Sequence, residues 1–281
     1  MAKKQASQLL AKKPTKSAKR LKCMLFGESG VGKTTAAVQF PRPYVIDTER
    51  GMEQDEYVDL LDARGGVVMT TTSFDTVLQQ VRALALEEHE FMTLVIDPIT
   101  VLYDGLADSW EKRVGNEFHK HHAAARRDWK RLTALLTTLD MNVIWTSHAK
   151  NEWLNSEMTG RTTFDGPKGA DYWIDLMLSI NRDRETGKRT ATIRKSRIKT
   201  LPVDDTFEFS YDAIAERYGR DVLERSAVAI DPRVLELGDL LAAREDGDDI
   251  EAKILKAKGV GSIKELSPTD IGKAIEWLQT I

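Results

Sequence analysis

The segment GESGVGKT, at residues 27–34, constrains the fold of this chain more than any other. It follows an apolar run, precedes a helix-compatible stretch, and fits the pattern G-x-x-x-x-G-K-[ST] at Gly27, Gly32, Lys33 and Thr34. Glycines let backbone N–H groups curl around phosphate oxygens without a clash from Cβ, and the start of the next helix adds positive potential. The alternative is a chance glycine-rich turn, which does not need this strand–loop–helix context. The pattern predicts a phosphate-binding loop in an α/β fold.

The ligands expected at this loop are ATP and Mg²⁺. The residues expected to bind the nucleotide are Gly27, Glu28, Ser29, Gly30, Val31, Gly32, Lys33, Thr34 and Thr35. The ammonium group of Lys33 should reach the β- and γ-phosphates, and the hydroxyl of Thr34 should ligate Mg²⁺. Kinases, GTPases, motors and switches all share such a loop, so other residues must decide the class.

Short apolar runs alternate with stretches of helical spacing. The runs expected to form strands are residues 21–26, 44–47, 67–70, 93–97 and 143–146. Helical spacing occurs at residues 74–86 and 129–139. Because alternating strands and helices require crossover connections, we expect a mainly parallel sheet that is buried on both faces. Residues 174–181 and 189–198 flank a polar turn, which predicts an antiparallel hairpin that extends this sheet.

Composition divides the chain into three expected parts. Residues 1–20 are rich in Lys, Ala, Ser and Gln, which predicts a flexible basic arm. Residues 21–232 should form the α/β ATPase core, and residues 233–281 a small helical C-terminal domain. A capping-box-like start, Ser-Pro-Thr-Asp at residues 267–270, predicts the last helix.

Charge is distributed unevenly between these parts. The 41 basic and 44 acidic residues give a net charge of −3, which by itself does not suggest a nucleic-acid partner. The first 22 residues contain eight basic and no acidic residues, so the remainder has 33 basic and 44 acidic residues and a net charge of −11. A basic arm on an acidic globule is expected to attract polyphosphates, with an affinity that falls as salt rises.

The single cysteine, Cys23, excludes an internal disulfide and favours a reducing compartment. No apolar run approaches the ~18 residues needed to span a bilayer. The basic N-terminus also lacks the apolar core of a signal peptide. We therefore expect a cytoplasmic protein without a membrane partner.

Two acidic residues that follow expected strands are candidates for catalysis. The run FMTLVID ends in Asp97, whose carboxylate should hold Mg²⁺, usually through water, or alternatively caps the next helix. The run YVID leads into Glu49, which either orients an attacking water as general base or is a solvated loop charge. The sequence has no guanine-reading NKxD-like segment, which argues against a GTPase.

Four segments, GESGVGKTT, IDTE, LVID and VIWTSH, resemble those of the RecA-like recombinase ATPases. The resemblance covers roughly residues 20–215. It is nearest to compact, phage-encoded RecA/RadA-type proteins that are linked to single-strand annealing and often described as AAA-family ATPases. It implies that Glu49 is the catalytic glutamate, that Asp97 is the magnesium-site aspartate and that His148 is a γ-phosphate sensor. Relatives commonly carry Gln at the sensor position, and a cap without a ligand role is the alternative for this histidine.

A further match, ATIRKSRIK, places Lys195 and Arg197 on one face of a strand expected at the edge of the sheet. In hexameric and filamentous relatives, such a K-x-R pair reaches the γ-phosphate of the neighbouring subunit and stabilises transition-state charge. The resemblance thus implies a homo-oligomer, a ring or a filament, with ATP sites at subunit interfaces. The alternative is an edge strand that positive charge protects from aggregation.

Two segments are candidates for contact with single-stranded DNA. Residues 149–170 are polar and contain glycines, and the equivalent segment of relatives is a DNA-contacting loop. Its cations and aromatic rings suit phosphates and stacked bases, and they are Lys150, Arg161, Lys168, Trp153 and Phe164. Residues 112–131 are basic and occupy the place of the first DNA loop of relatives, where Arg126 and Arg127 either bind DNA or form a solvated helix face.

The resemblance implies a DNA-stimulated ATP hydrolase that oligomerises on single-stranded DNA and promotes strand annealing or exchange. A single-strand-binding protein is a candidate loading partner, and the cytoplasm of a bacterial host is the expected location for a phage-encoded protein. Two alternatives stay open. One is a nucleotide-gated DNA-binding module with negligible turnover, and the other is a P-loop small-molecule or nucleoside kinase, which predicts a lid with convergent arginines.

Overall fold

The computed structural model describes residues 19–115 and 120–280. Contacts divide these residues into two compact units, one formed by residues 19–229 and a second that begins at Ile230. Residues 1–18 of the expected basic arm lie outside the described residues. None of the helices in the described ranges is both long and apolar enough to cross a bilayer.

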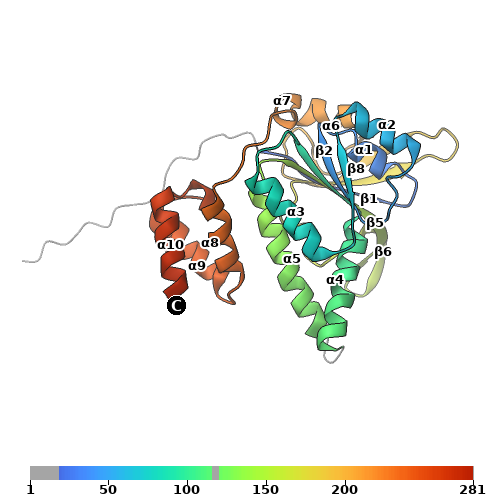
Figure 1. The fold of residues 1–281 in the computed structure, drawn as a ribbon. Helices are drawn as coiled ribbons and strands as arrows, with labels where there is room; N and C mark the ends of the chain where they lie inside the picture. The colour runs from blue at the N-terminus through green and yellow to red at the C-terminus, as the bar shows by residue number, and fades with distance from the viewer. Residues whose placement is uncertain (1–18, 116–119, 281) are drawn as a thin grey trace, which may run out of the picture. The chain divides into compact units, whose positions relative to one another are not determined.

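The first unit is built on one nine-stranded sheet with the order β3-β2-β4-β5-β1-β7-β8-β9, and β6 pairs with β5 away from this path (Figure 1). The strands are β1 (Lys22–Gly27), β2 (Pro43–Asp47), β3 (Val67–Thr70), β4 (Thr93–Asp97), β5 (Asn142–Leu154), β6 (Glu157–Phe164), β7 (Leu176–Arg182), β8 (Arg189–Ser196) and β9 (Thr206–Glu208). Pairings from β3 across to β7 are parallel, whereas β7, β8 and β9 pair antiparallel. The expected fold, a mainly parallel sheet extended by an antiparallel hairpin, is confirmed.

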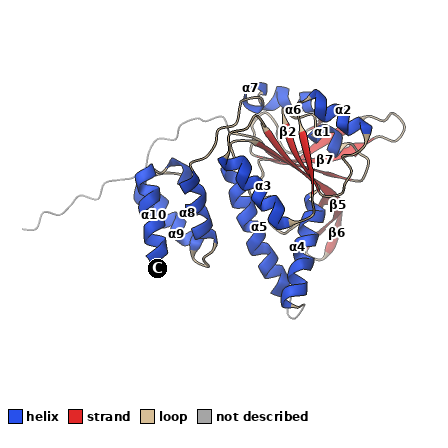
Figure 2. Cartoon of the chain, viewed as in Figure 1, coloured by secondary structure: helices blue, strands red, loops and turns tan. Residues whose placement is uncertain are grey.

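Helices cover both faces of this sheet (Figure 2). One face is covered by α1 (Lys33–Ala37), α2 (Asp55–Ala63), α6 (Tyr211–Tyr218) and α7 (Arg220–Leu223), and the other by α3 (Phe74–Leu86), α4 (Ile99–Val114) and α5 (Lys120–Thr138). Two buried faces explain why the central strands are continuously apolar rather than alternating. All six residues of β1 are buried, as are all five of β4.

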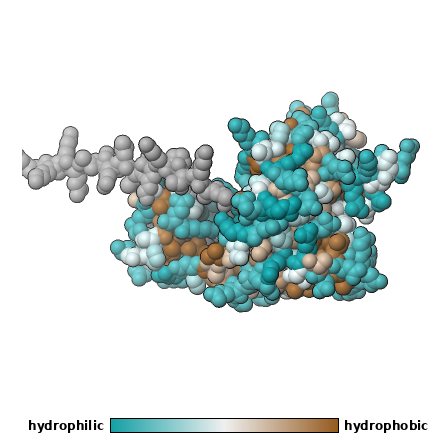
Figure 3. Space-filling view, turned by 90° about the horizontal axis from the view of Figure 1, so that it is seen from above, coloured by the Kyte–Doolittle hydropathy of each residue, from teal (hydrophilic) through white to brown (hydrophobic). Residues whose placement is uncertain are grey.

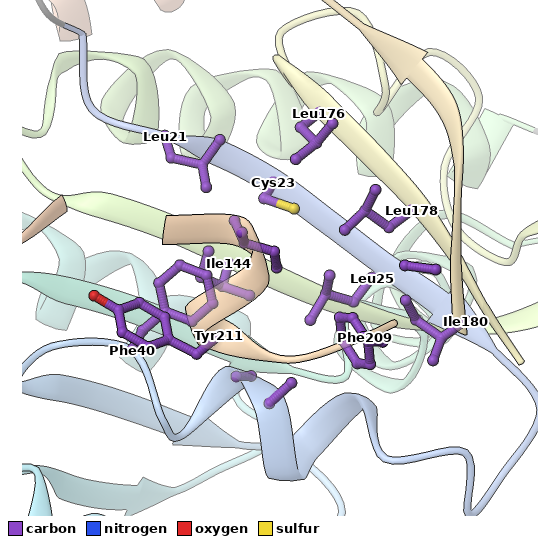
Figure 4. Close-up of a cluster of buried hydrophobic side chains, with 14 of the residues drawn as sticks. Leu21, Cys23, Leu25, Phe40, Ile144, Leu176, Leu178, Ile180, Phe209 and Tyr211 are labelled. Atoms are coloured by element: carbon purple, nitrogen blue, oxygen red, sulfur yellow. The ribbon is translucent and has the colours of Figure 1, made fainter. Parts of the chain in front are cut away.

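The core on the first face consists of side chains from the central strands and from the helices above them (Figure 4). Cys23 and Leu25 of β1 point to this face, together with Ile144 of β5 and Leu178 of β7. Tyr211 of α6 closes the cluster, where its ring lies 4.9 Å from that of Phe40 in an edge-to-face arrangement. In Figure 3, the face in view is mostly hydrophilic, with small hydrophobic areas.

The core on the opposite face contains a group of aromatic side chains in contact with one another. The Trp145 ring of β5 lies 5.4 Å from that of Trp129 in α5 and 4.6 Å from that of Trp173. Trp129 also contacts Phe74 of α3 and Tyr103 of α4, with ring centroids 6.3 and 5.4 Å apart. These contacts join the three helices of this layer to the strand that carries His148.

Residues 149–164 differ from the expected polar loop, because they continue β5 and form an antiparallel hairpin with β6. The strands are joined by a two-residue turn in which Asn155 and Ser156 have φ values of 51° and 67°. Left-handed values at both central positions define a type I′ turn, for which Asn-Gly is the usual sequence signal. Serine at the second position hid the turn from sequence analysis.

Two smaller expectations also differ from the structure. Only the last residues of β8, which include Lys195, lie at the sheet edge, because β9 pairs with Thr190–Thr192, and Arg197 lies beyond the last residue of the strand. Arg20, expected in the arm, is buried and donates hydrogen bonds to Asp140 Oδ1 and to the carbonyl oxygens of Val222 and Ser226. These partners satisfy the guanidinium and fasten the start of β1 to the globule.

The second unit contains the helices expected at the C-terminus. They are α8 (Pro232–Ala242), α9 (Gly247–Lys258), the short 3₁₀ helix η2 (Ile263–Glu265) and α10 (Pro268–Thr280). The Ser267 hydroxyl accepts a hydrogen bond from Asp270 N at 3.1 Å, as the capping-box sequence predicts. Apolar side chains from all three α-helices form a separate core, in which Leu237 is completely buried.

The core position of Cys23 leads to a first prediction. The side chain is completely buried in β1, and burial raises the pKa of its thiol. Because the thiolate is the reactive form, the native protein should react with a chromogenic disulfide reagent at less than about a tenth of the rate in denaturant. Since the chain has one cysteine, the absorbance change reports this residue alone. Equal rates in native and denaturing buffer would contradict the buried position.

Candidate nucleotide-binding site

The loop between β1 and α1 has the backbone geometry that its glycines predict. Gly30 and Gly32 have φ values of 76° and 94°, in the region that side chains with a Cβ rarely adopt. Gly27 requires the absence of a side chain for another reason, since a Cβ there would lie 2.4 Å from the carbonyl oxygen of Ile180. The loop is therefore held against β7, while Glu28, Ser29 and Gly30 are exposed.

Lys33 lies within the curve of this loop. Its buried ammonium donates hydrogen bonds to Gly27 O at 3.0 Å and to Glu28 O at 2.8 Å. Burial lowers the pKa of the Lys33 ammonium, and the nearby carboxylates of Asp97 and Glu49 oppose this shift. The lysine is thus held at the mouth of the loop, where an anionic ligand would compensate its buried charge.

Asp97 ends β4 directly beside the first turn of α1. The Thr34 hydroxyl donates to Asp97 Oδ2 at 2.8 Å, and the Thr146 hydroxyl donates to Asp97 Oδ1. Burial raises the pKa of Asp97, whereas both hydroxyl hydrogen bonds and Lys33 act in the opposite direction. A carboxylate and a hydroxyl at hydrogen-bond distance fit the hard oxygen ligands that Mg²⁺ prefers. Sequence analysis missed Thr146, although a polar residue inside an apolar run was a signal.

The loop after β2 is organised by two buried side chains. Asp47 Oδ1 accepts a hydrogen bond from Glu49 N, and Oδ2 accepts one from Met52 N, both at 3.0 Å. Thr48 joins this loop to the end of β4, since its N–H donates to Asp97 O and its hydroxyl to Pro98 O, each at 2.8 Å. The exposed Glu49 is therefore carried on a braced loop. Sequence analysis missed the role of Asp47, which ends an apolar strand just as Asp97 does.

His148 lies next to both the phosphate loop and Glu49. In the parallel pairing of β1 and β5, His148 is opposite Gly27, the first residue of the motif. Its Nε2 lies 3.0 Å from Glu49 Oε1, and both side chains are partly exposed. The structure thus brings together four residues that the sequence placed on different segments, namely Lys33, Glu49, Asp97 and His148.

The sequence profile of the AAA-domain family matches residues 19–201, more than half of the chain. The chain belongs to this family. A crystal structure of the RadB recombinase is similar over 74% of this chain and 90% of that chain, with 17% sequence identity and a TM-score of 0.46. No curated protein matches the chain. P-loop ATPases of the AAA type generally use ATP and Mg²⁺, which agrees with the chemistry of the Lys33, Thr34 and Asp97 groups.

Lys195 and Arg197 do not lie at the phosphate loop of their own AAA domain. The Lys195 ammonium donates to Asp171 O, and the Arg197 guanidinium donates to Tyr172 O. Arg197 also forms an ion pair with Asp175 at 3.5 Å. The bulge in the pairing of β8 with β7 lies at Arg194, before Lys195, and Arg197 follows the last residue of β8. They hold the segment that connects β6 to β7.

The hairpin β5–β6 presents most of the candidate DNA contacts of the AAA domain. Trp153 is 61% exposed, and Leu154 and Met158 beside it are also exposed. Arg161 is exposed on β6, and the Lys150 ammonium lies 3.0 Å from Asp165 Oδ1.

The remaining candidate DNA contacts differ in exposure and in their place in the fold. Phe164 is only half-buried and lies at the base of the hairpin beside Gly166, so it does not extend the exposed surface of the tip. Lys168 is exposed in the segment that follows β6. Arg126 and Arg127 are exposed on α5, an arrangement that fits either of the two readings of that helix.

The base of the hairpin is tied to the nucleotide side of the sheet through Asp165. Its carbonyl oxygen accepts hydrogen bonds from the hydroxyls of Thr100 and Ser147, both at 2.8 Å. Its N–H donates to His148 O at 2.8 Å, and the Thr100 hydroxyl accepts from His148 N at 3.2 Å. Sequence analysis missed both Thr100 and Asp165, because this contact joins residues 65 positions apart.

Arg194 of β8 fastens the same hairpin from the other side. Its guanidinium donates to Thr162 O at 3.3 Å and forms an ion pair with Glu152 at 3.7 Å. One contact is with β6 and the other with β5. The hairpin is therefore fixed to the sheet at its base, whereas its tip is exposed.

The bracing of the Glu49 loop by Asp47 leads to a second prediction. Replacing Asp47 with alanine leaves the N–H groups of Glu49 and Met52 without their acceptor, and an unsatisfied buried donor costs about 2 kcal/mol. Asp47→Ala should therefore lower the Tm by about 4–8 °C in thermal unfolding followed by circular dichroism. Asp47→Asn keeps an acceptor oxygen and should therefore lower the Tm by less than Asp47→Ala does. A Tm of the alanine variant equal to that of the wild type would contradict the bracing role.

Proposed function

We propose that this protein is a RecA-like, ATP-dependent recombination ATPase that binds single-stranded DNA, oligomerises on it and promotes strand annealing or exchange. The observation that carries the proposal is the convergence of Lys33, Asp97, Glu49 and His148 at one loop. The strand that bears His148 continues into an exposed hairpin with an aromatic tip. A nucleotide site and a polymer-binding element thus share one strand.

Hydrolysis in this proposal is an in-line attack of water on the γ-phosphate. Glu49 accepts the proton of the attacking water, whose oxygen bonds to the γ-phosphorus as the bond to the leaving ADP oxygen breaks. The Lys33 ammonium neutralises charge on the transferred group. Mg²⁺, held by Thr34 and Asp97, would supply Lewis-acid polarisation of the phosphate oxygens. The hydrogen bonds that the Asp47 carboxylate accepts from Glu49 N and Met52 N keep the Glu49 loop in place during this step.

Coupling between DNA and hydrolysis is assigned to His148. Its side chain contacts Glu49, whereas its backbone contacts Thr100 and Asp165 at the base of the hairpin. A shift of the hairpin on binding DNA therefore moves the group that holds the proposed base. By the same contacts, the nucleotide changes the position of the hairpin, as linkage requires.

Contact with DNA is assigned first to the hairpin. The exposed Trp153 ring suits base stacking, and Lys150 and Arg161 suit phosphates. Lys168, Arg126, Arg127 and the basic arm add sequence-independent attraction that weakens with salt. Phe164 takes the lesser role of supporting the base of the hairpin, since its ring lies against Gly166.

The oligomer completes the site in this proposal. Because Lys195 and Arg197 lie away from the phosphate loop of their own chain, they are assigned to the γ-phosphate of the neighbouring subunit in a ring or filament. Three further assignments belong to the same proposal: a cytoplasmic location, a single-strand-binding protein as loading partner, and a three-part chain. In that chain the basic arm ends before the buried Arg20, and the C-terminal part begins at Ile230. The compact phage-type recombinases are the class that it resembles.

A second candidate function, a nucleotide-gated binding module, is favoured by one observation. Glu49 Oε1 lies 3.0 Å from His148 Nε2, a contact that engages the carboxylate needed as a base. If this pair persists with nucleotide bound, ATP sets the position of the hairpin without turnover. Glu49→Gln separates the two functions, because an enzyme loses its cycle whereas a gate keeps its nucleotide-dependent affinity for DNA.

The third prediction concerns turnover. ATP hydrolysis by the wild type should rise when single-stranded DNA is added, and Glu49→Gln should lower kcat by about 10²–10⁴-fold without loss of ATP binding. The matched control is Glu53→Gln, which changes an exposed glutamate four positions away and should leave kcat unchanged. Phosphate release measured with and without DNA, together with particle mass, checks each point. Wild-type turnover that ignores both DNA and protein concentration would overturn the proposed function.

The fourth prediction concerns the hairpin tip. Trp153→Ala should weaken binding to labelled oligothymidine by about 5–100-fold, the effect expected for the loss of one stacked base. Trp277→Ala removes another exposed tryptophan, in the C-terminal unit, and should change affinity less than twofold. Fluorescence anisotropy at several salt concentrations measures both variants. Equal affinities of the two variants would remove the hairpin from the DNA site.

A further inference from the structure

Arg189, the first residue of β8, lies directly over the phosphate loop. A Cβ built on Gly32 would lie 2.6 Å from Arg189 Nε and 2.8 Å from both Cδ and Cζ. The guanidinium therefore occupies the space that a side chain at position 32 would fill. Gly32 immediately precedes Lys33, so Arg189 is a second cation at the same loop as the lysine of the phosphate-binding motif.

Backbone pairing within the sheet fixes the position of Arg189. Arg189 pairs with Arg182 across the β7–β8 hairpin. The carbonyl oxygen of Arg189 accepts a hydrogen bond from Phe209 N at 2.9 Å. The loop itself is held against the same hairpin through the contact of Gly27 with Ile180. Two backbone contacts thus fix β8 and the phosphate loop relative to each other.

The charge of Arg189 is uncompensated within the described parts of the chain. Among residues 19–115 and 120–280, no carboxylate forms an ion pair with its half-buried guanidinium. By contrast, Arg194 on the same strand pairs with Glu152, and Arg197 just beyond it pairs with Asp175. A partly desolvated guanidinium is stabilised by a bidentate anion such as phosphate, and it lies here beside a phosphate-binding motif.

We propose that Arg189 binds the phosphate groups of the nucleotide held by the phosphate loop of the same chain. The inference rests on the nucleotide binding in the proposed function and adds to it a second cation, in cis, besides Lys33. The inference distinguishes phosphate binding within one subunit from action across the subunit interface. Arg189 secures the polyphosphate within a single subunit, whereas Lys195 and Arg197 are left to act across the oligomer. A lone subunit then holds nucleotide firmly before assembly allows turnover.

The test compares nucleotide binding by variants of the full chain in the absence of DNA. The variants are Arg189→Ala, Arg189→Lys and the control Arg184→Ala, which removes an exposed arginine from the turn of the same hairpin. The probes are ATP, ADP and inorganic tripolyphosphate, titrated by calorimetry. We expect Arg189→Ala to weaken all three by about 10–100-fold, Arg189→Lys to lie between it and the wild type, and Arg184→Ala to stay within twofold.

Tripolyphosphate separates a phosphate contact from a contact with the base or ribose. If Arg189→Ala weakens ATP but leaves tripolyphosphate at wild-type affinity, the phosphate assignment is overturned. If it binds all three probes as the wild type does, this inference fails while nucleotide binding stands. If the wild type binds none of them, the proposed function fails as well. Should Arg189→Ala not fold by circular dichroism, Arg189→Gln, which keeps an extended polar side chain without the charge, decides the matter by the same criteria.

Discussion

The pairing of β1 between two parallel neighbours is the constraint on which the site depends. On one side, β5 places His148 opposite Gly27, and on the other, β7 lies so close that Gly27 cannot carry a side chain. Because parallel strands end at the same edge of a sheet, β4 adds Asp97 and β2 adds the Glu49 loop to this edge. The register of a few buried apolar strands therefore determines the distances between groups that are remote in sequence.

Buried polar groups then fix the chemistry within this frame. Asp97 is enclosed, and its carboxylate is compensated by the hydroxyls of Thr34 and Thr146. Asp47 is also buried and accepts hydrogen bonds from two backbone N–H groups. Since an unpaired buried charge is costly, these partners hold each carboxylate in one orientation. Residues of the fold therefore hold both carboxylates in position near the phosphate loop.

The hairpin β5–β6 extends from the strand that carries His148 to an exposed tip. Its base is fastened by Asp165 and by Arg194, and its tip exposes Trp153. The same strand leads from the tip to His148, whose side chain contacts Glu49. One strand thus joins a held base at the nucleotide site to an exposed tip, which is the arrangement on which the proposed coupling rests.

The sequence by itself determined the local units and their order. The phosphate loop, the apolar strands, the helix at residues 74–86 and the capped final helix are all written in short patterns, because glycine, periodicity and capping act over a few residues. Together with the family resemblance, these patterns singled out Lys33, Glu49, Asp97 and His148 as site residues. The tertiary structure alone decided which distant residues meet. These contacts are Thr146 on Asp97, Asp165 under His148, β9 beside β8, and the guanidinium of Arg189 over Gly32, and they join residues from 14 to 157 positions apart. Packing and register set those contacts, and neither is expressed in any local pattern.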